Sequence, residues 1–290
     1  MQKSSRLAAC FGRLREEGRA GLFPFVTAGD PDLAFTRELL PALARAGADG
    51  FELGVPFSDP LADGPTIQRS SMRALKAGAR LRDVLALVGE VRREIPGTPI
   101  VLMTYYNPIV AFGEGAFARE AARAGADGVI VPDLPPEEAG ELVEAMAEFP
   151  LDSVFMLAPT STPARIEIVN RAGSGFIYYV GQMGVTGARD SLDSGLRGAL
   201  ERLQRARNRP VLVGFGIKTP EQAAEVGESA EGVIVGSALI DVLEAEADRG
   251  GKLRAASWFV GALRRALEQS AAVRPGGAGR FSWAQDGRKD

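Results

Sequence analysis

The sequence predicts a (β/α)8 barrel, and three observations support that fold class. The first is a set of short apolar segments, at residues 22–27, 50–53, 100–105, 128–131, 153–157, 176–180, 211–215 and 232–235. The second is that these segments are continuously apolar, which is typical of parallel strands buried on both faces. The third is that alanine-rich amphipathic segments separate them, so the 290 residues hold eight β–α units. An open, doubly wound parallel sheet is the alternative fold.

A short repeat supports this alternation of helices and strands. The sequence Ala-Gly-Ala-Asp-Gly occurs at residues 46–50 and again at 124–128, and a degenerate copy, Ser-Ala-Glu-Gly, occurs at 229–232. An apolar segment follows or overlaps the end of each copy. We interpret each copy as a helix that ends on a glycine or small residue, a tight turn and the start of a strand.

The helices follow in order from the N-terminus. Arg13 and Arg15 interrupt the first apolar patch, which favours a short amphipathic helix over a signal peptide. Later helices are expected to include residues 35–45, 81–94, 116–124, 137–148 and 163–172. Thr219 and Gln222 have the spacing of a capping box that opens the helix after the seventh strand.

The C-terminal part of the chain divides into a last helix and a tail. Residues 252–269 predict an amphipathic helix, whose Trp258 and Phe259 are expected to pack on the barrel. From Ala271 onward the composition changes to Gly, Pro and Arg, which bury little apolar surface. We therefore expect a single barrel domain over residues 1–270 and a disordered tail over residues 271–290.

The composition excludes several classes of function. Histidine is absent, which excludes a histidine general base, a Ser-His-Asp triad and any histidine-ligated metal. The single cysteine, Cys10, cannot form an intrachain disulfide and is expected to be a small buried apolar residue. The net charge of −3 and the lack of a basic tract argue against nucleic acid or an anionic membrane surface. No apolar run approaches the roughly 20 residues of a membrane span. We expect a soluble, cytoplasmic protein without a metal ion.

The candidate catalytic groups are carboxylates near the end of the second strand, because the active site of such a barrel lies at the carboxyl ends of its strands. Glu52 stands within an apolar strand, where burial would raise its pKa toward neutrality, as proton exchange at pH 7 requires. A structural carboxylate bonded to backbone is the alternative. Asp63, eleven positions later, is either a second functional carboxylate or a turn-making aspartate, and Asp59 favours a turn.

The candidate phosphate site lies in the loops after the seventh and eighth strands. Gly214-Phe215-Gly216 leaves the seventh strand and Gly236-Ser237 leaves the eighth. Loops at these two positions commonly bind phosphate through backbone N–H groups and a helix N-terminus. Gly184 and Gly187, in the loop after the sixth strand, could donate to the same anion or could serve only loop flexibility.

These residues carry a resemblance to a known family. Residues 51–68, Phe-Glu-Leu-Gly-Val-Pro-Phe-Ser-Asp-Pro-Leu-Ala-Asp-Gly-Pro-Thr-Ile-Gln, resemble the signature of the tryptophan synthase alpha chain family. Four further segments agree in the same order, at residues 24–31, 103–108, 184–187 and 214–217. The resemblance extends from Phe11 to Leu267, so the tail lies outside it.

The resemblance implies a reaction and roles for two carboxylates. The family cleaves indole-3-glycerol phosphate into indole and glyceraldehyde 3-phosphate, a retro-aldol step that needs neither a metal nor an organic cofactor. Glu52 matches the carboxylate that protonates the indole ring carbon and then takes the hydroxyl proton of the side chain. Asp63 matches the carboxylate that accepts the indole N–H. Two carboxylates with opposite protonation states fit such a mechanism.

The resemblance also implies substrate and partner contacts. The indole pocket is expected to include Phe25, Tyr105 and Tyr178. The phosphate cradle is expected to include Gly187, Phe215, Gly216, Gly236 and Ser237. The family pairs with a beta chain, which carries pyridoxal phosphate, in an α2β2 heterotetramer. The residues expected at that interface are Pro56, Asp59 and Asn107.

One departure from the family and three other interpretations remain open. Gly181-Gln182-Met183 replaces the hydroxyl-bearing residues that many members carry before the glycine of the sixth loop, which affects loop ordering. Another phosphate-binding barrel enzyme, such as an indole-glycerol-phosphate synthase, would need a lysine within a strand, and Lys218 follows its strand instead. A partner-activating subunit without catalysis and a stand-alone lyase are the other two.

Overall fold

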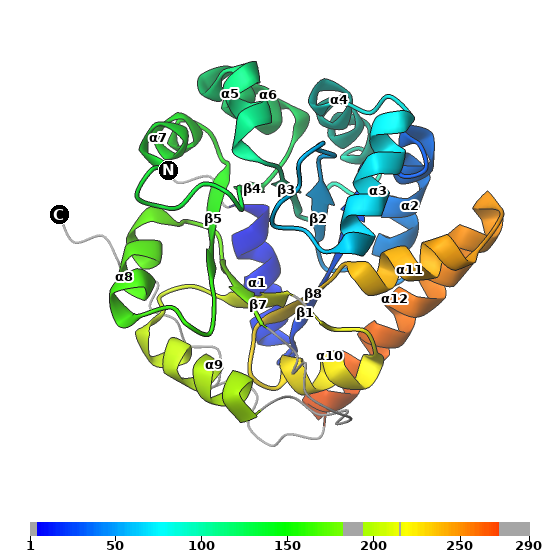
Figure 1. The fold of residues 1–290 in the computed structure, drawn as a ribbon. Coiled ribbons are helices and arrows are strands. Elements are labelled where there is room, and N and C mark those ends of the chain that lie inside the picture. Colours follow the sequence, from blue (N-terminus) through cyan, green and yellow to red (C-terminus); the bar gives the residue numbers. More distant parts are fainter. Residues whose placement is uncertain (1–4, 182–193, 215, 273–290) are drawn as a thin grey trace.

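The computed structural model describes residues 5–181, 194–214 and 216–272, and they form a closed barrel of eight parallel strands (Figure 1). Each strand pairs with the next along the chain, and β8 pairs with β1. This closure confirms the predicted barrel and excludes the open sheet. The strands are β1 (Gly21–Thr27), β2 (Phe51–Gly54), β3 (Ile100–Met103), β4 (Gly128–Ile130), β5 (Asp152–Leu157), β6 (Ile177–Val180), β7 (Val211–Gly214) and β8 (Gly232–Val235).

Helices surround the barrel in the order that the sequence predicts. In the described part of the chain they are α1 (Arg6–Glu16), α2 (Leu33–Arg45), α3 (Pro65–Lys76), α4 (Leu81–Val91), α5 (Tyr106–Phe112), α6 (Glu114–Ala124), α7 (Gly140–Ala147), α8 (Pro163–Ala172), α9 (Ser194–Ala206), α10 (Pro220–Gly227), α11 (Ser237–Ala245) and α12 (Arg249–Ala272). The capping box at α10 is confirmed, because the Thr219 hydroxyl accepts from the Gln222 N–H. Searched over the same residues, no helix is both long and apolar enough to span a membrane.

Most predicted boundaries shift by a few residues, and three differences bear on the candidate site or the tail. The third strand ends at Met103, so Tyr105 is the N-cap of α5 and Asn107 lies within that helix. Helix α3, which is not among the helices expected from the sequence, begins at Pro65, inside the segment 51–68 that carries the resemblance. The last helix continues to Ala272, which places two residues of the predicted tail in the barrel domain. Residues 273–290, the rest of the predicted tail, lie outside the described residues.

The prediction for the aromatic pair on α12 is half right. Phe259 is buried and joins the outer core, whereas Trp258 is 71% exposed. Adjacent residues on a helix point about 100° apart, so a helix that packs on a barrel with one side turns the neighbour of a buried residue toward solvent. The burial predicted for Cys10 is confirmed, since it is 5% exposed.

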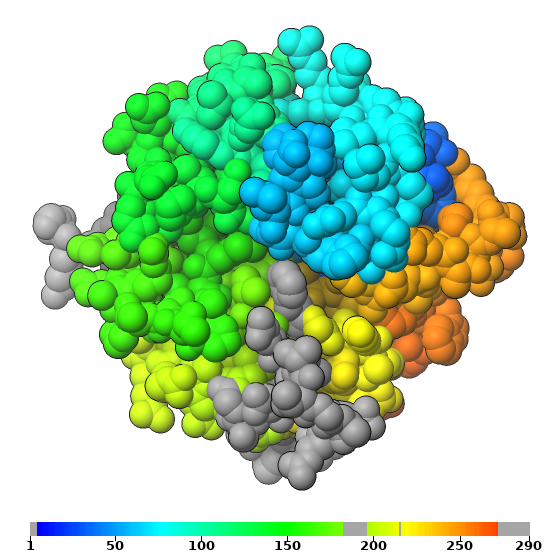
Figure 2. Space-filling view, in the orientation of Figure 1, coloured from blue at the N-terminus to red at the C-terminus, as the bar shows by residue number. Residues whose placement is uncertain are grey.

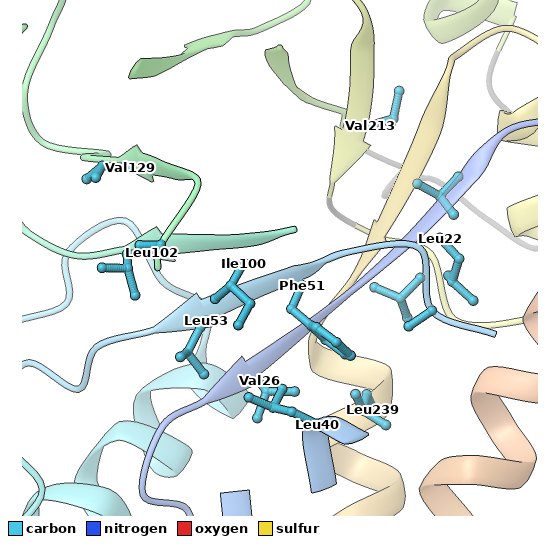
Figure 3. Packing of buried hydrophobic residues seen from close by; sticks show 14 of the residues in the cluster. Leu22, Val26, Leu40, Phe51, Leu53, Ile100, Leu102, Val129, Val213 and Leu239 are labelled. Carbon is cyan, nitrogen blue, oxygen red and sulfur yellow. The ribbon is translucent and has the colours of Figure 1, made fainter. Parts of the chain in front are cut away.

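Two apolar cores lie on the two sides of the strands. Alternate residues of β1 separate between them: Phe23 and Phe25 face the barrel interior, and Leu22 and Val26 face the surrounding helices. Figure 3 shows the outer core, in which strand residues such as Val26 approach Leu40 of α2 and Leu239 of α11.

Helix α1 closes the amino-terminal end of the barrel interior. It crosses the centre of the ring of strands in Figure 1 and contributes Leu7, Cys10, Phe11 and Leu14 to the inner core. The Phe11 ring lies 5.9 Å from that of Phe23 and 6.1 Å from that of Phe176. The interior at this end is therefore filled with side chains and leaves the opposite end for a ligand.

Buried acids just before β2, β4 and β8 hold the preceding strands β1, β3 and β7. Each acid belongs to one copy of the repeat, accepts the N–H of the first or second residue of the preceding strand, and binds an arginine. The sets are Asp49 with Leu22 and Arg19, Asp127 with Ile100 and Arg92, and Glu231 with Val211 and Arg207. The repeat therefore has a structural role that goes beyond ending a helix.

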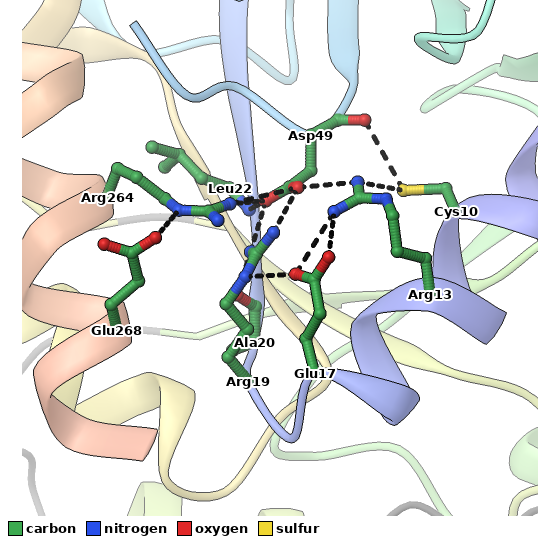
Figure 4. A network of polar contacts seen from close by, with 9 residues as sticks. All are labelled: Cys10, Arg13, Glu17, Arg19, Ala20, Leu22, Asp49, Arg264 and Glu268. Carbon is green, nitrogen blue, oxygen red and sulfur yellow. Dashed lines mark hydrogen bonds and ion pairs between the residues drawn. The ribbon is translucent and has the colours of Figure 1, made fainter. Parts of the chain in front are cut away.

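Asp49 binds side chains from several elements of the chain (Figure 4). Its carboxylate accepts from Arg19, which is itself 4% exposed, from Arg13 of α1 and from Arg264 of α12. Burial raises its pKa, but Arg19, Arg13 and the N–H of Leu22 outweigh that effect and keep the pKa below the usual range. One carboxylate thus fastens the first and last helices to β1.

Candidate active site

Glu52 lies in β2 at the carboxyl end of the barrel, in register with Phe25 of β1 and Val101 of β3. Its side chain faces the interior and the residue is 2% exposed. Among the described residues, neither carboxylate oxygen has a hydrogen-bond partner. Burial, together with the charge of Asp63, raises the pKa of Glu52 to about 8. Glu52 is therefore mostly protonated at pH 7. The raised pKa agrees with the prediction from the sequence.

Asp63 lies in the loop between β2 and α3, two residues before the helix begins. Partial burial raises its pKa to about 6, and the hydrogen bond from Tyr105 opposes that rise. Asp63 is mostly ionised at pH 7. The two carboxyl groups of the site therefore have opposite protonation states at the same pH.

Tyr105 connects β3 to the Asp63 loop. Its hydroxyl donates to Asp63 Oδ2 at 3.1 Å and accepts from the N–H of Ala62 at 2.9 Å. Its ring stacks on Phe57 with the ring centroids 5.1 Å apart. These contacts hold the carboxylate in one place. The resemblance points to Tyr105 only as a pocket residue, and Phe57 is a contact that the sequence analysis missed.

Phe25 and Tyr178 form an aromatic wall of the site, and two glycines make room for them. A Cβ at Gly54 would lie 2.6 Å from the Phe25 ring, and one at Gly214 would lie 2.2 Å from the Tyr178 hydroxyl oxygen. The Tyr178 hydroxyl lies near enough to Glu52 to oppose the rise of its pKa, although no hydrogen bond of normal geometry joins the two groups. The sequence places aromatic rings and glycines on neighbouring strands, but their complementary fit appears only in the fold.

The predicted phosphate cradle is partly described. Gly236 is the N-cap of α11 and Ser237 its first residue, so the unpaired N–H groups of the first turn face the carboxyl end of β8. A Cβ at Gly236 would lie 3.3 Å from Phe25 Cβ, which puts this helix end beside the aromatic wall. Gly216 has φ +80°, a left-handed conformation that favours glycine. Gly187 and Phe215, like Gln182, Met183 and Gly184, lie outside the described residues.

The predicted partner residues have different surroundings. Asp59 and Asn107 are exposed, and Pro56 is buried. Two exposed apolar side chains lie near them in sequence: Leu61 is 94% exposed and Val110 is 53% exposed. Leu61 stands among polar and turn-forming residues in its loop. That position is a signal of an exposed apolar surface, which the sequence analysis missed.

The arrangement can bind a flat apolar group that bears a polar N–H and an anionic end. A neutral carboxyl group at Glu52 can donate a proton to such a group, and an ionised carboxylate at Asp63 can accept a hydrogen bond from it. The N-terminus of α11 can hold the anion. Over residues 5–181, 194–214 and 216–272, no group of three or more His, Cys, Asp or Glu residues is placed to ligate a metal ion.

Known proteins resemble this chain over most of its length. The family model described as "Tryptophan synthase alpha chain" matches residues 11–268. The tryptophan synthase alpha chain of Geobacter sp. (strain M21) is 53% identical over 240 residues, which cover 83% of this chain and 90% of that protein. The alpha chain of Geobacter sulfurreducens is 50% identical over 265 residues, which cover 91% of this chain and 99% of that protein.

Solved structures agree with this match. Tryptophan synthase subunit alpha from Legionella pneumophila str. Paris has a TM-score of 0.84 at 38% identity, covering 91% of this chain and 99% of that chain. A chain of tryptophan synthase from M. tuberculosis has a TM-score of 0.82 at 37% identity, again covering 91% of this chain and 99% of that chain.

Proposed function

The chain belongs to the tryptophan synthase alpha chain family, and we propose that Glu52 transfers the protons of that family's reaction while Asp63 stabilises its charged intermediate. The reaction is the cleavage of indole-3-glycerol phosphate to indole and glyceraldehyde 3-phosphate, which makes the chain a carbon–carbon lyase of tryptophan biosynthesis. The observation that carries the assignment is the pair of carboxyl groups whose pKa values, about 8 and about 6, lie on opposite sides of neutrality.

Glu52 acts first as an acid. Indole is a poor leaving group as a carbanion, so its C3 must be protonated before the bond to the side chain breaks. The Glu52 carboxyl group gives its proton to C3 and becomes a carboxylate. It then takes the proton of the adjacent side-chain hydroxyl. The carbon–carbon electron pair returns to the ring, the carbonyl of glyceraldehyde 3-phosphate forms, and Glu52 ends as it began.

Asp63 stabilises the intermediate. Protonation of C3 leaves a positive charge on the ring, concentrated at the indole nitrogen. An ionised carboxylate that accepts the N–H bond is more favourable for this intermediate than for the neutral substrate, which is the requirement for catalysis. The hydrogen bond from Tyr105 helps to keep Asp63 ionised.

The remaining residues of the site would bind the substrate. Phe25, Tyr105 and Tyr178 supply the indole pocket, supported by their burial and by the glycines that accommodate two of their rings. Gly216, Gly236 and Ser237 hold the phosphate, supported by the helix end that Gly236 caps. Gly187 and Phe215 complete the proposed cradle on the resemblance alone.

The chain pairs with a tryptophan synthase beta chain, as its family does. We propose that Pro56, Asp59 and Asn107 lie at that contact, where Asp59 and Asn107 are exposed. We also propose that the alpha reaction uses no organic cofactor or metal on this chain, because Glu52 supplies both proton transfers and Asp63 stabilises the charged intermediate. A cytoplasmic location is part of the same proposal, supported by the biosynthetic role of the family.

Glu52→Gln tests the assignment most directly. The amide keeps the shape of the carboxyl group but cannot transfer a proton, and positioned general acid–base catalysis is typically worth about 10²–10⁴-fold. We expect indole release from indole-3-glycerol phosphate to fall by at least a hundredfold with the fold intact by circular dichroism. Glu90→Gln, an exposed carboxylate on α4, is the matched control and should keep full activity. A Glu52→Gln variant that retains more than a tenth of the activity would contradict the role of Glu52.

A further inference from the structure

Helix α3 is fastened to two neighbouring elements by polar side chains on one of its faces. These side chains are Thr66, Arg69, Ser70 and Arg73, spaced three and four residues apart. They reach Asp30, which follows β1, and the acidic residues Asp241 and Glu244 of α11. Helices α3 and α11 lie side by side in the ribbon and on the molecular surface (Figures 1 and 2).

Arg73 is the residue that joins all three elements. Its Nε donates to Asp30 Oδ1 at 2.8 Å and its Nη2 to Asp30 Oδ2 at 2.6 Å, while its Nη1 donates to Glu244 Oε1 at 2.6 Å. Asp30 is 8% exposed and also accepts from the Ser70 hydroxyl at 2.6 Å. A planar guanidinium group with donors on two sides can hold two carboxylates at once, which a lysine cannot do in this geometry.

Arg69 adds a second link to α11. Its Nη2 donates to Glu244 Oε2 at 3.0 Å and lies 3.8 Å from Asp241 Oδ1. Both oxygens of Glu244 are therefore occupied by α3. Exposed ion pairs contribute little to stability one at a time, so this set of contacts suggests a geometric role rather than a large effect on stability.

Helices α3 and α11, which the contacts of Arg69 and Arg73 with Glu244 join, begin at opposite ends of the proposed substrate. Helix α3 begins two residues after Asp63, and the Gln68 side chain of its first turn donates to the Asp63 carbonyl at 2.9 Å. Helix α11 begins at Gly236 and Ser237. The start of α3 therefore lies next to Asp63, the proposed acceptor of the indole N–H, and the start of α11 forms the proposed phosphate site.

We propose that Arg73, together with Glu244, is a positioning pair that sets the separation between Asp63 and the phosphate-binding end of α11. The inference rests on the proposed function, since it needs both Asp63 and α11 at the substrate. The bound substrate reaches both groups at once, so a shift of α3 relative to α11 moves Asp63 off the indole nitrogen while the phosphate stays bound. A misplacement of about 1 Å at a reacting group can reduce the rate by about a hundredfold.

The test is a double-mutant cycle with Asp63. Glu244→Gln is the first variant, because it removes the charge that Arg69 and Arg73 of α3 bind on α11 and leaves the Arg73–Asp30 pair intact. Arg73→Gln is the second variant, and it removes the ion pairs of Arg73 with both Asp30 and Glu244. Each is made with Asp63 and in an Asp63→Asn background, and kcat and KM for indole-3-glycerol phosphate are measured. Arg249→Gln is the matched control, because Arg249 joins α12 to Glu38 of α2 with a similar side-chain exposure.

We expect Glu244→Gln to lower kcat/KM by about fivefold or more with Asp63 present, mostly through kcat, and by less than twofold in the Asp63→Asn background. The dissociation constant for inorganic phosphate, from protection against thermal unfolding, should change by less than twofold. Arg249→Gln should leave kcat, KM and the dissociation constant for phosphate unchanged. Equal losses in both backgrounds, or no loss in either, would overturn the positioning role alone. An Asp63→Asn enzyme with full activity would overturn the proposed role of Asp63 and this inference with it.

Discussion

At the residue scale, the chemistry of the site depends on what surrounds two carboxyl groups. Glu52 has no hydrogen-bond partner in the described part of the chain and is fully enclosed, so its neutral form is favoured. Asp63 is less buried and accepts from Tyr105, so its charged form persists at neutral pH. Two groups of one chemical type thus receive opposite roles from their environments.

The raised pKa of Glu52 predicts a pH-dependent stability. In the unfolded chain its pKa is about 4.3, and in the folded chain it is about 8. Both states are protonated below pH 4, and between these two values only the unfolded state ionises. The free energy of unfolding contributed by Glu52 is therefore fully present at low pH and is lost as the pH rises toward 8.

Glu52→Gln removes this dependence, because the amide does not ionise. We expect the variant to melt at about the temperature of the unmodified chain near pH 4.5 and at least about 3 °C higher near pH 8.5. Differential scanning calorimetry at both pH values measures the difference. A melting-temperature difference that is the same at both values would show that Glu52 ionises equally in the folded and unfolded states.

Tyr105→Phe predicts a shift in the pH profile. The variant loses the hydrogen bond that lowers the pKa of Asp63, so this pKa should rise above about 6. Because the protonated form cannot accept the indole N–H, the acidic limb of the kcat/KM profile should move to higher pH. Tyr106→Phe is the control, since the Tyr106 hydroxyl donates to Glu114 on another helix. An acidic limb that stays in place would mean that Asp63 does not govern it.

At the element scale, the aromatic side chains of the site fit only where the neighbouring strand carries a glycine. Tyr178 of β6 and Gly214 of β7 lie on adjacent strands, and the tyrosine hydroxyl occupies the space that a side chain at 214 would need. The same relation holds for Phe25 of β1 and Gly54 of β2. The pocket wall is therefore built from pairs of strands rather than from single residues.

Gly214→Ala should damage the pocket more than the fold. Its Cβ would lie 2.2 Å from the Tyr178 hydroxyl oxygen and 2.5 Å from Cζ, so the buried ring must move. Overpacking of this kind typically costs about 1–3 kcal/mol, and KM should rise because Tyr178 belongs to the proposed indole pocket. Urea unfolding and steady-state kinetics measure the two effects.

Gly115→Ala is the control for this variant, since nothing lies within 4 Å of its Cβ. It lies in α6, where alanine is favoured over glycine by up to about 1 kcal/mol, so it should be neutral or stabilising. Unchanged kinetics in Gly214→Ala would show that Tyr178 does not contact the substrate.

At the scale of the whole molecule, the buried ion pairs that hold the strands and the proposed active site lie at opposite ends of the barrel. The amino-terminal end holds the buried acids with their arginines and the α1 side chains that fill the interior. The carboxyl-terminal end holds Glu52, Asp63 and the start of α11. This separation is typical of the fold and lets the binding end keep an unpaired carboxyl group.

Phe11→Ala tests this separation. Deleting a buried phenylalanine typically costs about 3–5 kcal/mol of stability, and Phe11 is 3% exposed between two other rings. The free energy of unfolding should fall by that amount, while kcat per folded molecule should stay within twofold. Trp258→Ala, at a side chain 71% exposed, is the matched control and should change stability by less than about 1 kcal/mol. A large loss of kcat in Phe11→Ala would show that the two ends are coupled.

The sequence by itself determined the features that depend on local patterns. The strands and the raised pKa of Glu52 follow from runs of apolar residues and from one acid among them. The α10 cap follows from the spacing of Thr219 and Gln222, and the burial of Cys10 from its small apolar side chain. Such patterns act through neighbours in the chain, and a strand enclosed on both faces buries any residue within it. The specific roles proposed for the site residues, from Glu52 and Asp63 to the pocket and partner residues, come from the family resemblance that these segments carry.

Only the tertiary structure decided which distant side chains meet. Tyr105 reaches Asp63 across 42 positions, Asp49 binds Arg264 across 215, and Arg73 binds Glu244 across 171. It also decided that Phe259 is buried while Trp258 is exposed. No local pattern encodes these outcomes, because closing the barrel brings β8 against β1 and fixes how each helix is rotated on the strands. The packing of the whole chain therefore sets the partners, and with them the charge, of the groups at the site.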